Sequence, residues 1–489
     1  MRRAGILLHP TSLPGPGPCG DLGESAYRFL DWLASAGCTL WQVLPLNPTG
    51  GSFSPYGSPG SFAGAPHLIS LDRLVVDGLL RVDELGQRPH SPGRVNTAAL
   101  DSWHRPLLHR ACDRLVERDP DSVEQFGTER PWAVKWALFE AIRESLSVDG
   151  WWQFPPELID LEPSTLDAVH EQHHATVQRH LAAQLLFFQQ WRAVRQAAAA
   201  RGIQIVGDLP IFVAGDGCDT WMHRDLFRWS SGGWRPDPIA GAPPDDFSEI
   251  GQCWGNPLYT WPAHTSSGFS WWADRFAAVF DQVDILRVDH FRGFCAAWEI
   301  PAATEDARTG TWGASPGEAL FEAVRQRCGG LPIIAEDLGV ITPDVNALRE
   351  KLAVPGMKIM QFAFGGDATH AYLPHNYDGD CWVAYTGTHD TDTARGWYHS
   401  APDSAKHRYR VYVGRDGNDI GWDFIRMAWG STARWAIAPM QDVLNLDGHA
   451  RMNTPGVAKG NWCWRVRDLP MHDAQRLAEL TWVFGRRGL

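Results

Sequence analysis

The sequence predicts a (β/α)8 (TIM) barrel enlarged by insertions, and three observations lead to this fold class. Eight short apolar segments follow one another, each ending near Gly, Pro, Asp or His, with helical patterns between several of them. Their near-continuous apolarity is typical of parallel strands that are covered on their outer face. The chain has 489 residues, far more than the ~250 typical of this barrel, so the excess must lie in insertions.

The predicted strands and helices can be placed in order along the chain. The strands are residues 5–10, 39–45, 203–210, 284–290, 331–339, 357–364, 381–390 and 438–444. The first helical pattern, residues 24–37, has one apolar face and ends at a glycine, and the face consists of Ala26, Phe29, Leu30, Leu33 and Ala34. Residues 317–328 and 342–352 are helical patterns after later strands. The second of these begins with Thr342 as N-cap and Pro343 in the first helical position.

Two long stretches interrupt the barrel pattern. Residues 66–200 have mainly helical patterns and form the first predicted insertion. Residues 211–275 are rich in Gly, Pro and Trp and form a predicted loop-rich insertion over the mouth of the barrel. We expect one catalytic barrel over residues 1–489. The eighth strand ends near residue 444, which leaves no room for a C-terminal β-sandwich.

Composition limits the partners and the cellular location. A net charge of −13 without a basic cluster argues against nucleic acid. No apolar stretch approaches the ~20 residues of a membrane helix, and the N-terminal apolar run is shorter than the roughly 7–15 residues of a signal peptide. Nine cysteines without a CxxC pair indicate reduced thiols in a cytoplasm. The oligomeric state is left open.

The tryptophan content indicates the class of ligand. The chain has 25 Trp residues, many of them in segments rich in Gly and Pro. An indole ring can stack its apolar face on a sugar and offer its N–H to a hydroxyl. Core packing explains any single Trp, but the set as a whole favours a carbohydrate.

Four acidic residues, Asp208, Asp289, Glu336 and Asp390, each fall at the C-terminal end of a predicted strand. Active sites of this fold lie at that face. Alternation puts Arg287 on the same side of its strand as Asp289, where a guanidinium favours the ionised carboxylate. Capping or salt bridging could explain each acid singly, but four together are hard to explain structurally. Two cooperating carboxylates are the machinery of glycosidic chemistry.

At these residues the chain resembles the bacterial 4-α-glucanotransferases (amylomaltases, or disproportionating enzymes) of glycoside hydrolase family 77. The likeness runs from end to end and in the expected order, through segments that include GILLHPTSLPGPGPCGDLG, LWQVLPLNPTG, GDLPIFVA, LRVDHFRGF, IIAEDLGVITPDV, YTGTHDTDT and ARMNTPGVAKGNWCWR. The resemblance implies retaining transfer of a 1,4-α-glucan segment to the 4-hydroxyl of an acceptor. Malto-oligosaccharides, glucose and α-glucans are the implied partners, and the chemistry requires no cofactor and no metal.

The resemblance also implies a role for each site residue. Asp289 matches the nucleophile, Glu336 the acid/base, and Asp390 the third carboxylate, which grips ring hydroxyls. Arg287 matches the arginine oriented on the nucleophile, and His389 a hydroxyl-binding histidine. Four further matches line the sugar cleft, namely Asp208, Trp254, Tyr56 and Asn453. Residues 241–259 resemble the mobile loop that arches over the substrate.

The chain departs from the family pattern at four positions. Asp246 stands where Tyr is usual, Ala65 and Thr391 where Asn is usual, and Asn47 where Gly is usual. None of these is one of the three carboxylates, so the departures bear on subsite affinity and not on the chemistry.

Three other functions compete with glucan transfer. The first is a hydrolase of malto-oligosaccharides, which differs in its products, and the second is a glucan-binding protein that has lost catalysis. The third is a zinc peptidase, because His170, Glu171, His174 and His180 have the spacing of a zinc-peptidase helix. The alternative explanation is that these four residues form a solvent-exposed face of a helix in the insertion.

Overall fold

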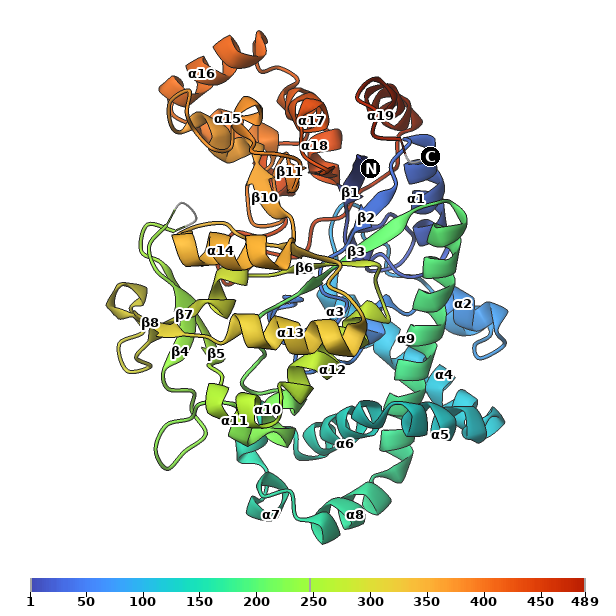
Figure 1. The fold of residues 1–489 in the computed structure, drawn as a ribbon. Helices are drawn as coiled ribbons and strands as arrows, with labels where there is room; N and C mark the ends of the chain where they lie inside the picture. The colour runs from blue at the N-terminus through green and yellow to red at the C-terminus, as the bar shows by residue number, and fades with distance from the viewer. Residues whose placement is uncertain (1, 246–247, 488–489) are drawn as a thin grey trace.

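The computed structural model describes residues 2–245 and 248–487, and its centre is a sheet of eight parallel strands (Figure 1). The order around the sheet is β10-β11-β12-β1-β2-β3-β6-β9. The strands are β1 (Arg3–Leu7), β2 (Leu40–Gln42), β3 (Gln204–Leu209), β6 (Ile285–Val288), β9 (Ile333–Ala335), β10 (Gly356–Ile359), β11 (Trp382–Tyr385) and β12 (Trp435–Pro439). The predicted (β/α)8 barrel is therefore confirmed.

The barrel closes between β9 and β10, and this seam is joined differently from the other strand pairs. The Ala335 N–H donates to the Pro355 carbonyl oxygen at 2.8 Å. Two residues further along each chain segment, the Met357 N–H donates to the carboxylate of Asp337 at 2.7 Å. A side-chain carboxylate thus takes the place of a backbone acceptor at the seam.

Several predicted strands differ from the observed boundaries, and in two of them the predicted strand runs into a helical turn. The eighth strand was predicted at residues 438–444, whereas β12 covers 435–439 and α18 (Met440–Val443) follows it. The predicted strand 357–364 is β10 followed by the 3-10 helix η9 (Met360–Phe364). In both places the apolar run continues from a buried strand into a buried helical turn, and periodicity cannot separate the two.

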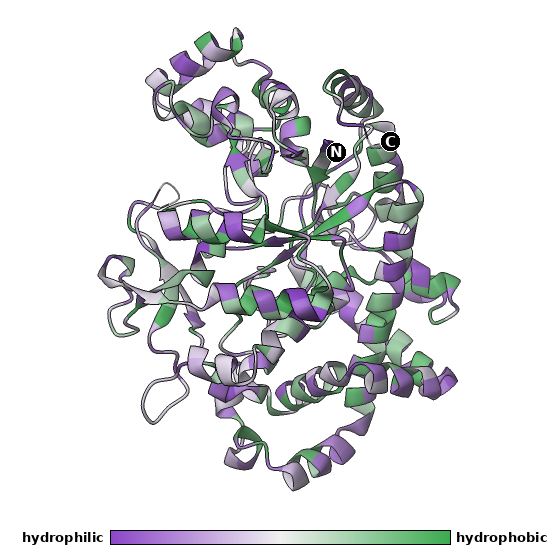
Figure 2. Ribbon diagram, in the orientation of Figure 1, coloured by the Kyte–Doolittle hydropathy of each residue, from purple (hydrophilic) through white to green (hydrophobic). Residues whose placement is uncertain are grey.

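The barrel helices follow the expected pattern with local differences. In α1 (Glu24–Ser35), Trp32 is buried and Ala34 is exposed, the reverse of the predicted face at these two positions. Helices α13 (Gly317–Cys328) and α14 (Pro343–Leu352) lie where they were predicted, and both carry hydrophobic and hydrophilic residues (Figure 2). Thr342 precedes α14, but its hydroxyl accepts a hydrogen bond from Arg292 at 2.7 Å instead of capping the helix.

Between β2 and β3 the chain is mostly helical (Figure 1). The helices are α2 (Leu71–Val76), α3 (Thr97–Ala99), α4 (Arg105–Arg118), α5 (Pro120–Glu129), α6 (Pro131–Leu146), α7 (Pro156–Ile159), α8 (Pro163–Gln172) and α9 (His174–Ala200). Two buried glutamines of α9 hold the segment after β2. Gln184 bonds both backbone groups of Gly64, at 2.8 and 3.0 Å, and Gln190 does the same with Ser70, at 2.7 and 3.2 Å.

A second, antiparallel sheet with the order β5-β4-β7-β8 stands beside the barrel mouth. Its strands are β4 (Ile239–Ala242), β5 (Gln252–Pro257), β7 (Ala296–Ile300) and β8 (Thr311–Ala314). The sequence did not predict this sheet. The stretch 211–275 also contains α10 (Cys218–Met222), α11 (Trp261–Ser266) and most of α12 (Ser270–Phe280). Short strands interrupted by Gly and Pro carry a weak periodic signal, which explains the expectation of loops.

The C-terminal third adds helices to the barrel. They are α15 (Ala394–Ser400), α16 (Asp403–Val413), α17 (Ile420–Gly430) and α19 (Met471–Val483). The described residues after β12 form helical elements and no β-sandwich, as predicted. Arg486 is fully buried and donates to several backbone carbonyls, including those of Trp429 at 2.7 Å and Arg3 at 3.1 Å. In the described part of the chain, no helix is long and apolar enough to cross a membrane.

Candidate active site

A cavity of about 710 Å³ opens at the C-terminal ends of the barrel strands. It collects eight of the nine predicted site residues, namely Tyr56, Trp254, Arg287, Asp289, Glu336, His389, Asp390 and Asn453. These residues come from segments spread between residues 56 and 453, and the barrel topology brings the ends of the strands to one face.

Asp289 follows β6 and is held by Arg287 on the same side of the strand. Arg287 Nη1 lies 2.9 Å from Asp289 Oδ1, and the guanidinium is almost fully buried. The Asp289 N–H donates to the Leu209 carbonyl of the neighbouring strand at 3.0 Å. The predicted pairing of guanidinium and carboxylate is therefore present, and the backbone at this strand end is fixed.

Asp208 does not line the cavity, which corrects the interpretation of this residue as a cleft residue. Its carboxylate is completely buried and accepts from Arg287 Nη1 at 2.8 Å to both oxygens. The hydroxyl of Tyr56 donates to the same carboxylate at 2.7 Å. The strand register explains this, because Asp208 on β3 is paired with Arg287 on β6 inside the barrel wall. Asp208 thus positions two residues that do face the cavity.

Glu336 follows β9, and an unusual backbone conformation at His290 fixes it beside Asp289. His290 has φ +47°, in the left-handed region that non-glycine residues rarely adopt. Its N–H donates to Glu336 Oε2 at 2.7 Å. The Glu336 N–H donates to Val288 O at 3.1 Å, and the Phe291 N–H donates to Glu336 O at 3.0 Å. Strain at a residue next to the predicted nucleophile is typical of functional sites.

Burial shapes the protonation of both carboxyl groups. Burial raises the pKa of Asp289 to about 6, against the opposing effect of the Arg287 charge. Burial also raises the pKa of Glu336 well above its ordinary value; Arg287 opposes this rise and the negative charge of Asp289 adds to it. The raised pKa of Glu336 favours its protonated form, whereas the charge of Arg287 favours the ionised form of Asp289. Two carboxyl groups with different surroundings thus share the cavity.

Asp390 has a different environment. Burial works against its charge, but His389 and Asn453 outweigh burial and lower the pKa of Asp390 to about 2. Asn453 Nδ2 donates to Asp390 Oδ1 at 2.6 Å, and His389 Nε2 lies 3.1 Å from Oδ2. The Asn453 N–H also donates to the His389 carbonyl at 3.0 Å. This third carboxylate remains an anion over the whole neutral range.

Aromatic rings form the walls of the cavity. Tyr56 stacks on His389 with ring centres 5.0 Å apart and planes 14° apart, and Trp462 packs against Tyr56 at 5.6 Å. Trp254 meets His290 edge-on at 4.9 Å. The guanidinium of Arg292, which also lines the cavity, lies 3.6 Å from the ring centre of Trp312, which is 37% exposed. Half-exposed rings beside carboxylates are suited to sugars.

Sequence reasoning missed several of these residues. His290 follows Asp289, and Trp462 lies nine residues after Asn453; both are inside segments that carry the family resemblance, so those segments were the available signal. Trp312 belongs to the set of Trp residues in Gly- and Pro-rich segments that favoured a carbohydrate, but it reaches the cavity through β8 of the unpredicted sheet. Its position could not be found without knowing that sheet.

The departures from the family pattern take part in local packing. Asn47 Nδ2 donates to the carbonyls of Ser61 and Ala63, at 3.0 and 2.8 Å, and so holds the loop after β2. Thr391 Oγ1 accepts from the Thr388 N–H at 2.9 Å. Asp246 lies outside the described residues. The segment 241–259 includes the end of β4 and all of β5.

The zinc-peptidase pattern does not form on one helix. His170 and Glu171 belong to α8, which ends at Gln172, whereas His174 and His180 belong to α9. His180 lies 3.3 Å from Glu144 instead of facing the other histidines. Within residues 2–245 and 248–487, no three His, Cys, Asp or Glu side chains form a metal-binding group.

Acidic groups and aromatic rings at the open end of a parallel eight-stranded barrel define a carbohydrate-active barrel enzyme. The model of the 4-alpha-glucanotransferase family, glycoside hydrolase family 77, matches residues 8–471. The chain belongs to this family.

Relatives match the chain over nearly its whole length. The 4-alpha-glucanotransferase of Thermus thermophilus is 43% identical over 477 residues, which cover 95% of both chains. That of Synechocystis sp. is 41% identical over 496 residues, 99% of this chain and 98% of the relative. The solved structure of the amylomaltase from Streptococcus agalactiae in complex with acarbose has a TM-score of 0.94, 35% identity and complete coverage of both chains. These matches agree with the resemblance found in the sequence.

Proposed function

We propose that this protein cleaves a 1,4-α-glucan with Asp289 as nucleophile and Glu336 as general acid/base, and passes the bound segment to an acceptor. Its family and the relatives named 4-alpha-glucanotransferase support the reaction class. The observation that carries the residue assignment is geometric: Asp289, held by Arg287, and Glu336, held by the His290 N–H, line the same cavity. The substrates are malto-oligosaccharides and longer α-glucans, and glucose is an acceptor.

The reaction has two steps. Asp289 attacks the anomeric carbon and forms a glycosyl–enzyme bond, while Glu336 gives its proton to the departing glycosidic oxygen. Glu336, now ionised, then takes the proton from the 4-hydroxyl of the acceptor, which attacks the same carbon and releases Asp289. Two inversions return the α configuration. Asp390 accepts hydrogen bonds from ring hydroxyls, and its low pKa keeps it an acceptor throughout.

The strand register supports retention. Val288 is paired with Ala335, so Asp289 and Glu336 follow at neighbouring positions on adjacent strands. Adjacent strands lie roughly 5 Å apart, close to the ~5–5.5 Å between the carboxyl groups of retaining enzymes. Inverting enzymes require a wider gap for a water molecule between the sugar and the base.

The same proposal covers the organisation and location of the protein. The barrel is one catalytic unit, and residues 66–200 and 211–275 are its insertions. The nine cysteines, all in the described part of the chain, are free thiols, which supports a reducing compartment such as the cytoplasm.

Incubation with maltotriose tests the proposal. The wild-type protein should produce glucose and a ladder of longer chains with little new reducing end, whereas a hydrolase would raise the number of reducing ends. Asp289→Ala and Glu336→Gln should each lose transfer by roughly 10³-fold or more while still binding maltose. Because Asn is isosteric with Asp, Asp403→Asn on exposed α16 is a matched surface control. Wild-type turnover in Asp289→Ala would end the assignment.

A further inference from the structure

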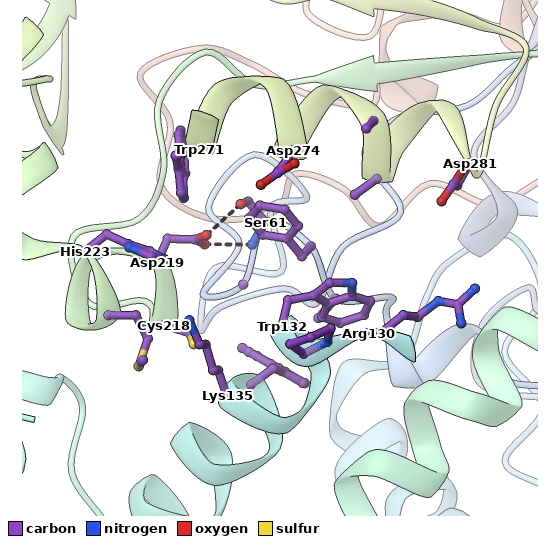
Figure 3. Close-up of a pocket in the computed structure, with 18 of the residues that line it drawn as sticks. Ser61, Arg130, Trp132, Lys135, Cys218, Asp219, His223, Trp271, Asp274 and Asp281 are labelled. Carbon is purple, nitrogen blue, oxygen red and sulfur yellow. Dashed lines mark hydrogen bonds between the residues drawn. The ribbon is translucent and has the colours of Figure 1, made fainter. Parts of the chain in front are cut away.

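A second cavity, of about 970 Å³, lies outside the candidate active site (Figure 3). Figure 3 shows Trp271 and Asp274 of α12 on one side and Trp132 and Lys135 of α6 on the other. The loop that contains Ser61 and the helix α10 complete the wall. Asp289, Glu336 and Asp390 do not line this cavity. Its volume falls in the range of small-molecule sites.

Aromatic rings form one wall of this second cavity. Trp132 is half-buried and packs on Phe62, at 6.3 Å and 28° between planes, and on Phe188, at 5.7 Å. All three rings line the cavity, and each is only partly covered by protein. Flat apolar faces that remain accessible beside polar groups are what a sugar ring packs against.

The charged groups around these rings are balanced in sign. Five acidic residues and five Lys or Arg residues line the cavity. Some are paired with each other, as Arg327 is with Asp274 at 3.3 Å. Lys135 and Arg192 make no ion pair within the described residues and are exposed. A phosphate-bearing ligand favours an excess of positive charge, whereas neutral hydroxyls both donate to acids and accept from cations.

Two backbone segments connect this cavity with the candidate active site. The segment 56–63 carries Tyr56 in the active-site cavity and Ser61 in the second one. The segment 214–219 runs from Asp216 in the first cavity to Asp219 in the second. Asp219 binds the two segments together, because it accepts from the N–H and the hydroxyl of Ser61, both at 2.8 Å (Figure 3).

We infer that the second cavity is an additional binding site for a segment of neutral 1,4-α-glucan, with Trp132 as its main stacking surface. The choice of this glucan among neutral sugars rests on the proposed function. A long glucan chain would be held at this site while the barrel mouth processes another part of the chain or another molecule. Bound sugar would also contact the segment 56–63, which carries Tyr56. One continuous stretch of backbone therefore lines both the second cavity and the candidate active site.

Isothermal titration with maltoheptaose tests the inference in a Glu336→Gln background, which prevents turnover. The expected stoichiometry is two glucans per chain. Adding Trp132→Ala should weaken the second site roughly tenfold or more and leave the other unchanged. Ala278→Trp fills the same cavity without removing a contact and should have the same effect. Trp482→Ala, an equal truncation at a 69% exposed position on α19, should keep both sites.

The outcomes separate the inference from the proposed function. A stoichiometry of one, or two sites that withstand both Trp132→Ala and Ala278→Trp, would overturn the inference. Equal binding of cellopentaose in the second cavity would overturn the assignment to α-linked glucan, and so would competition by inorganic phosphate. Transfer by the wild-type protein on maltotriose is measured in parallel. Absence of transfer would contradict the proposed function, whereas the number of binding sites tests only the inference.

Discussion

Replacing Asp208 by Asn tests whether a buried charge that never meets the substrate sets the pH range of the enzyme. Asp208 shares Arg287 with Asp289 and raises the pKa of Asp289 through its negative charge. Asparagine keeps the shape and one acceptor oxygen but removes the charge. The pKa of Asp289 should therefore fall below about 6. Since the proposed mechanism needs ionised Asp289, the acid limb of the pH profile should move to lower pH.

The size of this shift follows from the contacts. Arg287 Nη1 lies 2.8 Å from an Asp208 oxygen and 2.9 Å from an Asp289 oxygen, so those two oxygens are at most about 6 Å apart. Two unit charges at that distance interact by ~3 kcal/mol with an effective dielectric constant of about 20. One pKa unit corresponds to ~1.4 kcal/mol. Dividing the first figure by the second gives a shift of about 2 pKa units, and the positive charge of the guanidinium between the two acids reduces it. The acid limb should therefore move by about 1 to 2 pH units.

The assay is the pH dependence of kcat/KM for transfer on maltotriose, measured between pH 4 and 9. Tyr56→Phe is the matched control, because it removes the hydroxyl that donates to Asp208 and leaves the charge in place. Its acid limb should stay where it is in the wild type. Circular dichroism checks that Asp208→Asn is folded, since changing one partner of a buried ion pair costs ~3 kcal/mol or more. An unmoved acid limb in a folded, active Asp208→Asn protein would refute the coupling between these two acids.

Three further predictions concern the seam, the C-terminal anchor and the cavity wall. Asp337→Ala should lower the free energy of unfolding by ~3 kcal/mol, because the Met357 N–H loses its acceptor and the buried Arg349 loses its ion-pair partner. Thermal unfolding measures this, and a loss below ~1 kcal/mol contradicts it. Arg486→Met should cost a similar ~3 kcal/mol in denaturant unfolding, since several buried carbonyls lose their donor, while kcat stays unchanged. Trp312→Ala should raise KM for maltoheptaose roughly tenfold with little change in kcat, and an effect on kcat alone would exclude a binding role.

Much of the fold could be predicted because buried parallel strands leave a simple signal. The strand that ends before Asp289 is short, apolar and bounded by polar residues, and the structure has it at residues 285–288. The small antiparallel sheet was not predictable in the same way. In β5 exposure alternates along a strand that contains Gly255 and ends at Pro257, so its pattern resembles a loop.

The candidate site was predictable as a set of residues and only partly as an arrangement. Positions at strand ends indicated that Asp289, Glu336 and Asp390 would share one face, and they do. The burial of Asp208 was not predictable, because alternation gives the side of a strand but not the depth of a side chain below the cavity. The contact of His290 with Glu336 depends on a left-handed backbone conformation at His290, and no pattern in the sequence predicted that conformation.

The seam between β9 and β10 has a consequence for how the barrel wall moves. Glu336 directly follows the strand on one side of this seam, where the Asp337 carboxylate stands in for a backbone acceptor. Local opening is easiest where few backbone hydrogen bonds must break together. Amide protons along this edge should therefore exchange with heavy water sooner than those of β1, which is paired on both sides. In the proposed mechanism, the group that protonates the leaving oxygen therefore follows a strand edge that we expect to open early.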